Sequence, residues 1–185
     1  MQNNWKKAEN ILNKGGVVVL PTDTLYGIVG CAMSKKVVER IYGIKGRTES
    51  KPFIVLITSY KDLETFSIKI DKGQAKFLEK IWPGKVSVIL PCKLAKFKYI
   101  HRGTNGIAFR MIGKRNKNLF NLINKVGPLV APSANIESLL PAKTIKQAKE
   151  YFGNKVDLYI SSGVKNGKSS TLISYLSKTP IILRK

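Results

Sequence analysis

The chain has 185 residues, of which 43% are hydrophobic and 9% aromatic; this composition excludes a disordered polypeptide and allows one domain with a sizeable core. Its 33 Lys and Arg residues outnumber its 11 Asp and Glu residues, and the net charge of +22 indicates either a polyanionic partner or a general compositional bias. Two cysteines and one histidine are too few for a disulfide framework, a zinc cluster or a histidine-based triad, and we expect His101 on the polar surface.

Hydrophobic periodicity and turn residues predict many short strands mixed with helices, without strict βαβ alternation. This pattern favours an α/β fold: a single domain over residues 1–185, with a twisted sheet of mixed parallel and antiparallel strands and flanking helices. The helices are expected at 4–13, 35–42, 60–66, 71–81, 116–125 and 144–151. The strands are expected at 17–20, 53–57, 86–90, 107–111, 128–131, 156–160, 171–176 and 181–183.

The first predicted strand, 17–20, lies in the sequence GGVVVLPTDTLYG and has the β-branched, apolar character of a strand buried on both faces. Pro21 is expected to end its hydrogen-bond ladder. The polar residues Thr22, Asp23, Thr24 and Tyr26 follow. Because α/β sheets bind ligands beyond the ends of their strands, this stretch is a candidate ligand site as well as a possible solvated turn.

A basic loop is predicted after the second helix, at 44–52, where Lys45, Arg47 and Lys51 surround Gly46. An arginine fork beside a mobile lysine suits phosphate or carboxylate oxygens. A solvated basic loop is the alternative for this segment taken alone.

No acidic residue lies between Glu79 and Glu137, while eleven basic residues do. Within this window, the predicted loop 93–104 interleaves basic residues with aromatic ones, which either stack on single-stranded nucleic acid or anchor the loop. Further along, the strand at 107–111 carries Arg110 among apolar neighbours. A buried guanidinium must be paired, so Arg110 is a candidate anion ligand or a member of a structural ion pair.

Two later loops are also candidate phosphate sites. Ser133 and Asn135 follow a short strand and either offer oxygens and amides to a phosphate or cap a turn. Residues 163–169 nearly match a P-loop, but have three residues between the glycines instead of four and are followed by a predicted strand. A P-loop must open a helix, so a P-loop NTPase is rejected.

Several segments together resemble the YrdC-like family of L-threonylcarbamoyladenylate synthases (TsaC type), in the family's order and spacing over essentially the whole chain. They are PTDTLYG (21–27), IKGR (44–47), WPGK (82–85), FR (109–110), APSAN (131–135), GKSSTLI (167–173) and ILR (182–184). The chain is similar to the short, single-domain form. It departs from the family's pattern after Arg110, where residues 111–114 replace the usual proline and short acidic-histidine stretch. It departs again after Asn135, where 136–138 and 141–144 replace the usual Ser-Gly and Ser-Pro-Thr, and at Lys51, where asparagine is common in some members.

The resemblance implies a nucleotidyltransferase that makes threonylcarbamoyl-AMP and pyrophosphate from L-threonine, bicarbonate or CO2, and ATP, with Mg²⁺ accompanying the ATP. It also implies downstream proteins that transfer the threonylcarbamoyl group to tRNA beside the anticodon.

Carried over position by position, the resemblance assigns Lys45 and Arg47 as catalytic and ATP-binding residues, and no side chain as a metal ligand. The other implied ATP-binding residues are Ser133, Asn135, Ser170 and Arg184. The implied threonine-binding residues are Thr24, Tyr26, Arg110 and Ala131. Such a site would act by positioning and charge stabilisation, since no side-chain nucleophile is evident.

A second hypothesis is a non-catalytic protein of the same fold that binds tRNA or double-stranded RNA through its positive charge. An RNA-binding protein is expected to show a broad basic face with stacking aromatics, whereas a synthase needs small polar residues that converge on one pocket. The sequence has no apolar run long enough to span a membrane and no apolar signal core at its start, so we expect a cytoplasmic protein.

Overall fold

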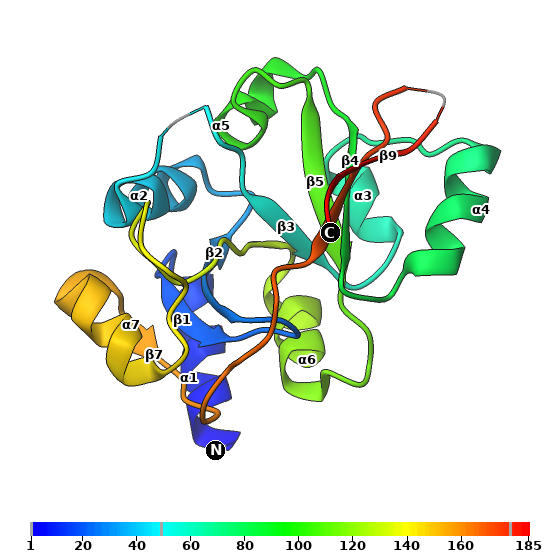
Figure 1. The fold of residues 1–185 in the computed structure, drawn as a ribbon. Helices are drawn as coiled ribbons and strands as arrows, with labels where there is room; N and C mark the ends of the chain where they lie inside the picture. Colours follow the sequence, from blue (N-terminus) through cyan, green and yellow to red (C-terminus); the bar gives the residue numbers. More distant parts are fainter. Residues whose placement is uncertain (1, 49, 178) are drawn as a thin grey trace.

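The computed structural model describes residues 2–48, 50–177 and 179–185, and the strands of that part form one nine-stranded sheet (Figure 1). The strands are β1 (Val18–Pro21), β2 (Tyr26–Cys31), β3 (Ile54–Ile57), β4 (Val86–Pro91), β5 (Gly106–Met111), β6 (Leu129–Val130), β7 (Leu158–Tyr159), β8 (Thr171–Ser174) and β9 (Ile181–Arg184). The helices are α1 (Gln2–Asn13), α2 (Lys35–Lys45), α3 (Lys61–Thr65), α4 (Lys72–Ile81), α5 (Lys98–His101), α6 (Lys117–Val126) and α7 (Ile145–Phe152), with 3-10 turns η1 (Ala95–Phe97) and η2 (Gly153–Lys155).

The sheet order is β7-β1-β2-β6-β3-β5-β4-β8-β9. The pairs β1–β7, β3–β5 and β4–β8 are parallel, and the other neighbouring pairs are antiparallel. The predicted mixed sheet is therefore confirmed. Within the described residues, no helix combines the length and the apolar character that crossing a bilayer would require.

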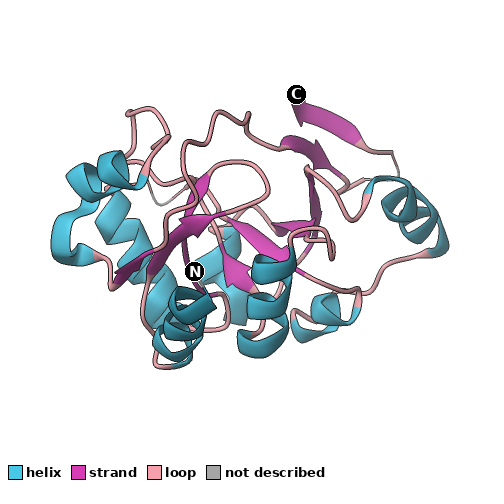
Figure 2. Ribbon diagram, turned by 90° about the horizontal axis from the view of Figure 1, so that it is seen from below, coloured by secondary structure: helices cyan, strands magenta, loops and turns pink. Residues whose placement is uncertain are grey.

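Alternating side chains of the strands divide the core into two clusters. On one face, α1 and α6 pack against a cluster that includes Val18, Leu56 and Leu129. Neighbours in sequence such as Val19 and Val55 belong to the larger cluster, which contains buried residues of α2, α3, α4 and α7. Figure 2 shows helices beneath and beside the strands, while loops rise on the opposite side.

Strand β2 is absent from the sequence-based prediction, which ended the first strand region at Gly27. Its sequence, YGIVGC, contains two glycines that suggest turns, yet the strand is almost entirely buried in the middle of the sheet. Gly30 is needed there, because a Cβ atom would lie 2.3 Å from Val37 Cγ1 of α2. Pro21 also belongs to β1, where it pairs with Tyr26 instead of ending the strand before it.

Helix α2 is longer than predicted, and this changes the interpretation of Lys45. The prediction ended the helix near Tyr42 and placed Lys45 in a loop, but α2 continues to Lys45 and ends at Gly46, which has the left-handed conformation of a helix C-cap. Lys45 therefore projects from the last helical turn and is fully buried.

The segment 93–104 was predicted to be a basic loop, but much of it forms η1 and α5. Phe97 and His101 are buried, and the Tyr99 hydroxyl donates a hydrogen bond to the carbonyl of Ala32. The expectation that His101 lies on the surface is wrong, because its ring accepts from the Gly103 amide and packs inside this short helical region. These aromatics anchor the segment, and Phe97 is not free to stack on a nucleic acid base.

Candidate functional site

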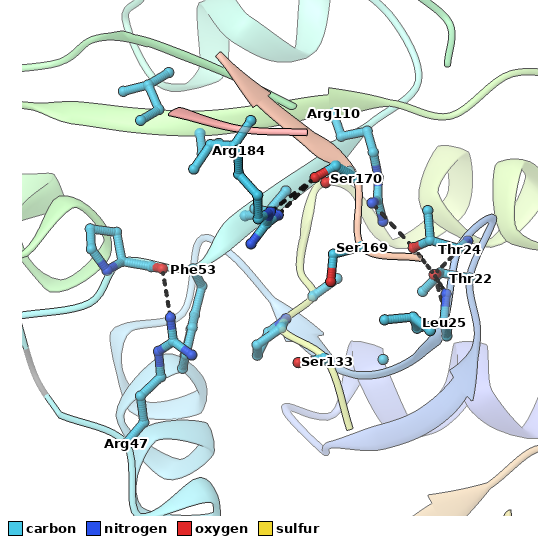
Figure 3. Close-up of a pocket in the computed structure, with 18 of the residues that line it drawn as sticks. Thr22, Thr24, Leu25, Arg47, Phe53, Arg110, Ser133, Ser169, Ser170 and Arg184 are labelled. Carbon is cyan, nitrogen blue, oxygen red and sulfur yellow. Dashed lines mark hydrogen bonds between the residues drawn. The ribbon is translucent and has the colours of Figure 1, made fainter. Parts of the chain in front are cut away.

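The chain surrounds one well-formed cavity of about 280 Å³, close to the lower end of the range for small-molecule sites, which starts at about 300 Å³. The cavity lies between the β1–β2 turn, the start of β3 and strand β5 (Figure 3). The segments after β6, before β8 and after β8 complete its wall. Its polar lining residues are Thr22, Thr24, Tyr26, Arg47, Thr104, Arg110, Ser133, Ser169, Ser170 and Arg184, and its apolar ones include Leu25, Pro52, Phe53, Ala108, Ala131 and Leu176.

Three arginines approach this cavity from three separate elements. Arg47 follows α2, Arg110 comes from β5, and Arg184 ends β9; Figure 3 shows them on different sides of the space that contains Ser133 and Ser169. Three guanidinium groups around a small cavity create a strongly positive field, so the cavity suits an anionic ligand.

The β1–β2 turn is held in shape by the Thr22 side chain. Its hydroxyl donates to the carbonyl of Leu25 at 2.7 Å and accepts from the backbone amides of Thr24 and Leu25. The Thr24 hydroxyl then lies 3.3 Å from Arg110 Nη1, which donates to it. The turn therefore presents a hydroxyl and a buried cation side by side at the cavity wall.

Arg110 is buried together with a carboxylate that sequence reasoning noted but did not assign, that of Asp23. Arg110 Nη2 lies 3.1 Å from Asp23 Oδ1, and both side chains are at least nine-tenths buried. Burial lowers the pKa of Arg110, and the Asp23 charge opposes that shift. Among the described residues, Arg110 Nε has no hydrogen-bond partner, so one buried donor remains for a ligand to satisfy. The structural ion pair and the anion ligand, which the sequence left as alternatives, are compatible.

The residues that precede Arg110 on β5 make room for a ligand. Gly106, Ala108 and Arg110 alternate along the strand, so they share the face that lines the cavity. A Cβ atom at Gly106 would lie 2.6 Å from Ile89 and 2.7 Å from Leu176, which shows how closely the walls approach here.

Arg184 is held in place by the segment before β8. Its Nε and Nη2 atoms donate to the carbonyl of Ser170 at 3.2 and 2.9 Å. The Ser170 hydroxyl lies 2.9 Å from that of Ser87 on β4. Ser170 thus positions Arg184 through its backbone, while its side chain is already engaged with a neighbour.

Lys45 and Asn135 are the two predicted site residues that do not line the cavity. The Lys45 ammonium donates to the backbone carbonyls of Ser133, at 2.7 Å, and of Asn135. Burial lowers the pKa of Lys45 to about 7, with the positive charge of Arg47 adding to the shift. The Asn135 amide oxygen accepts from the Ser133 hydroxyl at 2.6 Å. In this structure both residues support the 133–135 loop through hydrogen bonds and do not line the cavity themselves.

Arg47 rests against an aromatic ring. Its guanidinium carbon lies 5.3 Å from the centre of the Phe53 ring, and its Nε donates to the carbonyl of Lys51 at 3.0 Å. Burial lowers the pKa of Arg47. One face of its guanidinium is covered by Phe53, and the group as a whole borders the cavity.

Tyr26 and Ala131 also line the cavity, and the Tyr26 hydroxyl is bonded to the backbone of another segment. It donates to the carbonyl of Gly163 at 2.7 Å and accepts from the amide of Ser162 at 2.9 Å. Tyr26 therefore fastens the segment after β7. That segment has no helix, which agrees with rejecting a P-loop.

The same segment touches the β1–β2 turn at Gly167, where a Cβ atom would lie 2.2 Å from the carbonyl oxygen of Thr24. Because the obstacle is backbone, we expect Gly167→Ala to lower the free energy of unfolding by about 1–3 kcal/mol. Gly43→Ala is the matched control: Gly43 lies within α2 with open space around it, so alanine should raise stability by about 0.5–1 kcal/mol. Urea unfolding of both variants measures the contrast, and equal stabilities would contradict the close contact.

Eight of the ten predicted site residues line the cavity. Sequence reasoning did not assign Asp23, Phe53, Thr104 and Ser169. Ser169 directly precedes the predicted residue Ser170. Gly106 and Ala108, which alternate with larger residues before Arg110, indicate a strand face that could border a cavity. Nothing local in the sequence pairs Asp23 with Arg110, since 87 positions separate them.

The cavity can bind anions and orient polar groups. Among the described lining residues there are hydroxyls and guanidinium groups, but no histidine, cysteine or carboxylate. Chemistry at this site would therefore proceed between bound molecules, with the protein supplying position and positive charge.

Comparison with known proteins adds relatives with this fold. A family model named Sua5/YciO/YrdC and described as "Telomere recombination" matches residues 10–185. The chain is 30% identical over 184 residues to the threonylcarbamoyl-AMP synthase of Pyrococcus abyssi, covering 97% of this chain and 54% of the relative. It is 31% identical over 165 residues to the synthase of Nitrosococcus oceani, covering 87% of each. The chain thus spans about half the length of the archaeal relative and most of the bacterial one.

A solved structure of P. abyssi Sua5 complexed with L-threonine superposes with a TM-score of 0.88 at 29% identity, covering 97% of this chain and 53% of that one.

Proposed function

The chain belongs to the Sua5/YciO/YrdC family, and from that premise we propose that it makes L-threonylcarbamoyl-AMP and pyrophosphate from ATP, L-threonine and bicarbonate or CO2. The observation that carries this proposal is the convergence of three guanidinium groups and several hydroxyls on one cavity. An RNA-binding surface would not need these groups to enclose so small a space.

The cavity divides into two chemically distinct parts. Arg47, Arg184 and Ser133, which all line the cavity, would hold the phosphates of ATP, with the two arginines neutralising their charge. Arg110, whose Nε has no hydrogen-bond partner in the described part of the chain, would bind the carboxylate of threonine beside the Thr24 hydroxyl. With threonine bound in this way, its amine would lie between its carboxylate anchor and the phosphate-binding arginines.

In the proposed reaction, the threonine amine forms a bond to the carbon of CO2 and loses a proton, which gives a carbamate. A carbamate oxygen then attacks the α-phosphorus of ATP, and the bond to the β-phosphate oxygen breaks, releasing pyrophosphate. The protein would hold the two anions close together and stabilise the charge that develops on the α-phosphate. Lys45 would act by maintaining the 133–135 loop.

We propose that Mg²⁺ arrives with the ATP. Across the described residues, no three His, Cys, Asp or Glu side chains cluster as metal ligands, and Mg²⁺ commonly binds through substrate phosphates and water. We also propose that the product passes to proteins that modify tRNA, and that this occurs in the cytoplasm, where free cysteines such as Cys31 and Cys92 persist.

The test is pyrophosphate release from Mg-ATP and bicarbonate, with and without L-threonine. Threonine-dependent release with formation of threonylcarbamoyl-AMP would support the synthase. No release, together with no ATP binding in a titration, would overturn it and favour the RNA-binding alternative. Salt-dependent binding of tRNA would then be the next measurement.

Arg110→Ala is expected to raise the KM for threonine by about 10- to 100-fold, because a charge-assisted hydrogen bond contributes about 1.5–3 kcal/mol. The KM for ATP should change much less. Steady-state kinetics with each substrate varied in turn measures the contrast. Arg110→Lys keeps a positive charge beside Asp23 while removing the guanidinium fork, and exposed Arg115→Ala is the control. Equal changes in both KM values would argue against a carboxylate anchor.

A further inference from the structure

Two segments that border the cavity contact each other: the described residues of segment 45–51, which are 45–48 and 50–51, and the loop 133–137. The Lys45 ammonium donates to carbonyls of the second segment, and the Lys45 carbonyl accepts from the backbone amide of Glu137 at 2.9 Å. The junction extends beyond Lys45, through the side chain of Glu137.

The Glu137 carboxylate makes three contacts with the 45–51 segment. It accepts from the Thr48 backbone amide at 2.6 Å, from the Thr48 hydroxyl at 2.8 Å, and from the Lys51 ammonium. The Glu137 side chain is 21% exposed and that of Lys51 is 56% exposed. These interactions, with that of Lys51 largest, lower the pKa of Glu137 to about 2, so the carboxylate is ionised at neutral pH.

Lys51 connects this contact to Arg47. The Lys51 carbonyl accepts from Arg47 Nε at 3.0 Å and from the Tyr42 hydroxyl at 2.9 Å. The Tyr42 and Phe53 rings are stacked, with 4.0 Å between their centres. The Arg47 guanidinium lies over the same Phe53 ring. The orientation of the Arg47 guanidinium therefore depends on where the Lys51 backbone is held.

We propose that Glu137, through Lys51 and Thr48, is a positioning residue that holds Arg47 at the cavity. Glu137 and Lys51 are two positions at which the sequence departs from the pattern it otherwise resembles, and the structure shows them paired with each other. The Thr48 amide and hydroxyl and the Lys51 ammonium are groups that typically bind an anion, and the Glu137 carboxylate is the anion that they bind here. The inference rests on the proposed function, because it assigns Arg47 to the phosphates of ATP.

Removing Glu137 alone would add net positive charge near the cavity, and an anionic nucleotide would bind more tightly for that reason. The informative variant is therefore E137A/K51A, which keeps the net charge while removing the contact. The matched control is K6A/E9A, which also keeps the net charge and removes the ion pairs that Glu9 makes with Lys6 on α1 and with Lys125 on α6. Neither Lys6 nor Glu9 lines the cavity.

Three measured quantities test the proposal in the whole 185-residue chain. The first is hydrogen exchange of the Thr48 amide by NMR, which we expect to be at least about tenfold faster in E137A/K51A because its acceptor is gone. The second is the Kd for Mg-ATP by calorimetry, which should rise about tenfold or more, while the KM for threonine stays within about twofold. K6A/E9A should match the wild type in all three.

The outcomes separate the inference from the proposed function. If the wild type binds ATP and E137A/K51A binds it equally well, the positioning role is overturned and the synthase stands. Tighter binding by E137A/K51A would also overturn it, and would show the carboxylate to be a competitor of phosphate. Unchanged exchange at Thr48 would show that the contact does not hold the loop. A wild type that binds no ATP would overturn the proposed function itself and, with it, this role in nucleotide binding.

Discussion

Arg47→Ala is expected to reduce threonine-dependent pyrophosphate release by at least about 100-fold. An arginine fork makes charge-assisted bonds to phosphate that contribute about 1.5–3 kcal/mol each, so the loss of two such bonds corresponds to a factor of 10²–10⁴ or more. The fold should survive, because Arg47 follows α2 and its side chain, among the described residues, donates only to the carbonyls of Lys51 and Pro52. Kinetics with ATP varied, and urea unfolding, measure the two effects.

Arg47→Lys refines this prediction. Lysine keeps the charge but loses both the planar fork and the stacking on Phe53, so we expect activity between that of the wild type and that of Arg47→Ala. Lys168→Ala, at an exposed position near the cavity, controls for the general loss of positive charge. Unchanged turnover in Arg47→Ala would contradict the phosphate-binding role.

The sequence was most informative where a chemical group and its backbone setting coincide. The β-branched run before Pro21 predicted a buried strand, and three of the polar residues that follow it, Thr22, Thr24 and Tyr26, line the cavity. The apolar strand around Arg110 indicated that this cation must be paired, and the structure shows Asp23 as its partner. Both inferences depend on short-range pattern and on the high cost of burying polar groups.

The predictions failed at the end of α2 and at strand β2, and both failures involve glycine. Glycine occurs at turns and helix ends, but also inside helices and strands where a neighbouring element packs closely. The predicted helix ends at 42, just before Gly43, but α2 continues through Gly43, and the left-handed Gly46 ends it. The predicted polar stretch ends at Gly27, but Gly27 and Gly30 lie in the buried strand β2, where α2 packs too closely for a side chain at Gly30. Only tertiary packing distinguishes these cases, and no short window of sequence contains it.

The misplaced helix end has a direct consequence for the site. A lysine in a loop would extend toward solvent and meet a phosphate, whereas a lysine in the last turn of α2 is directed into the protein. The Lys45 ammonium accordingly contacts carbonyls of the 133–135 loop, and the side chain is fully buried. The residue that the resemblance assigns to catalysis therefore supports the site from within, and its substitution should affect stability as well as activity.

Lys45→Ala is expected to lower the free energy of unfolding by about 2–5 kcal/mol, as for other long buried side chains truncated to alanine. It also leaves the carbonyls of Ser133 and Asn135 without a donor. Lys45→Met keeps the volume of the aliphatic stem, so its loss should be nearer about 1–3 kcal/mol, the cost of unsatisfied buried acceptors. Both variants should bind ATP poorly, because the 133–135 loop loses its support in each. Urea unfolding and ATP titration separate the packing contribution from the polar one.

The pH dependence of Lys45→Met provides a further check on the buried ammonium. Burial lowers the pKa of Lys45 to about 7 in the folded protein, so between pH 7 and about 10.5 the unfolded chain holds more protons at this residue than the folded one. The contribution of Lys45 to the free energy of unfolding must therefore rise with pH across that range, whereas methionine has no such dependence. We expect the wild type to gain stability relative to Lys45→Met between pH 6 and pH 9. A constant difference would show that Lys45 remains charged throughout, held by the carbonyls that accept its hydrogen bonds.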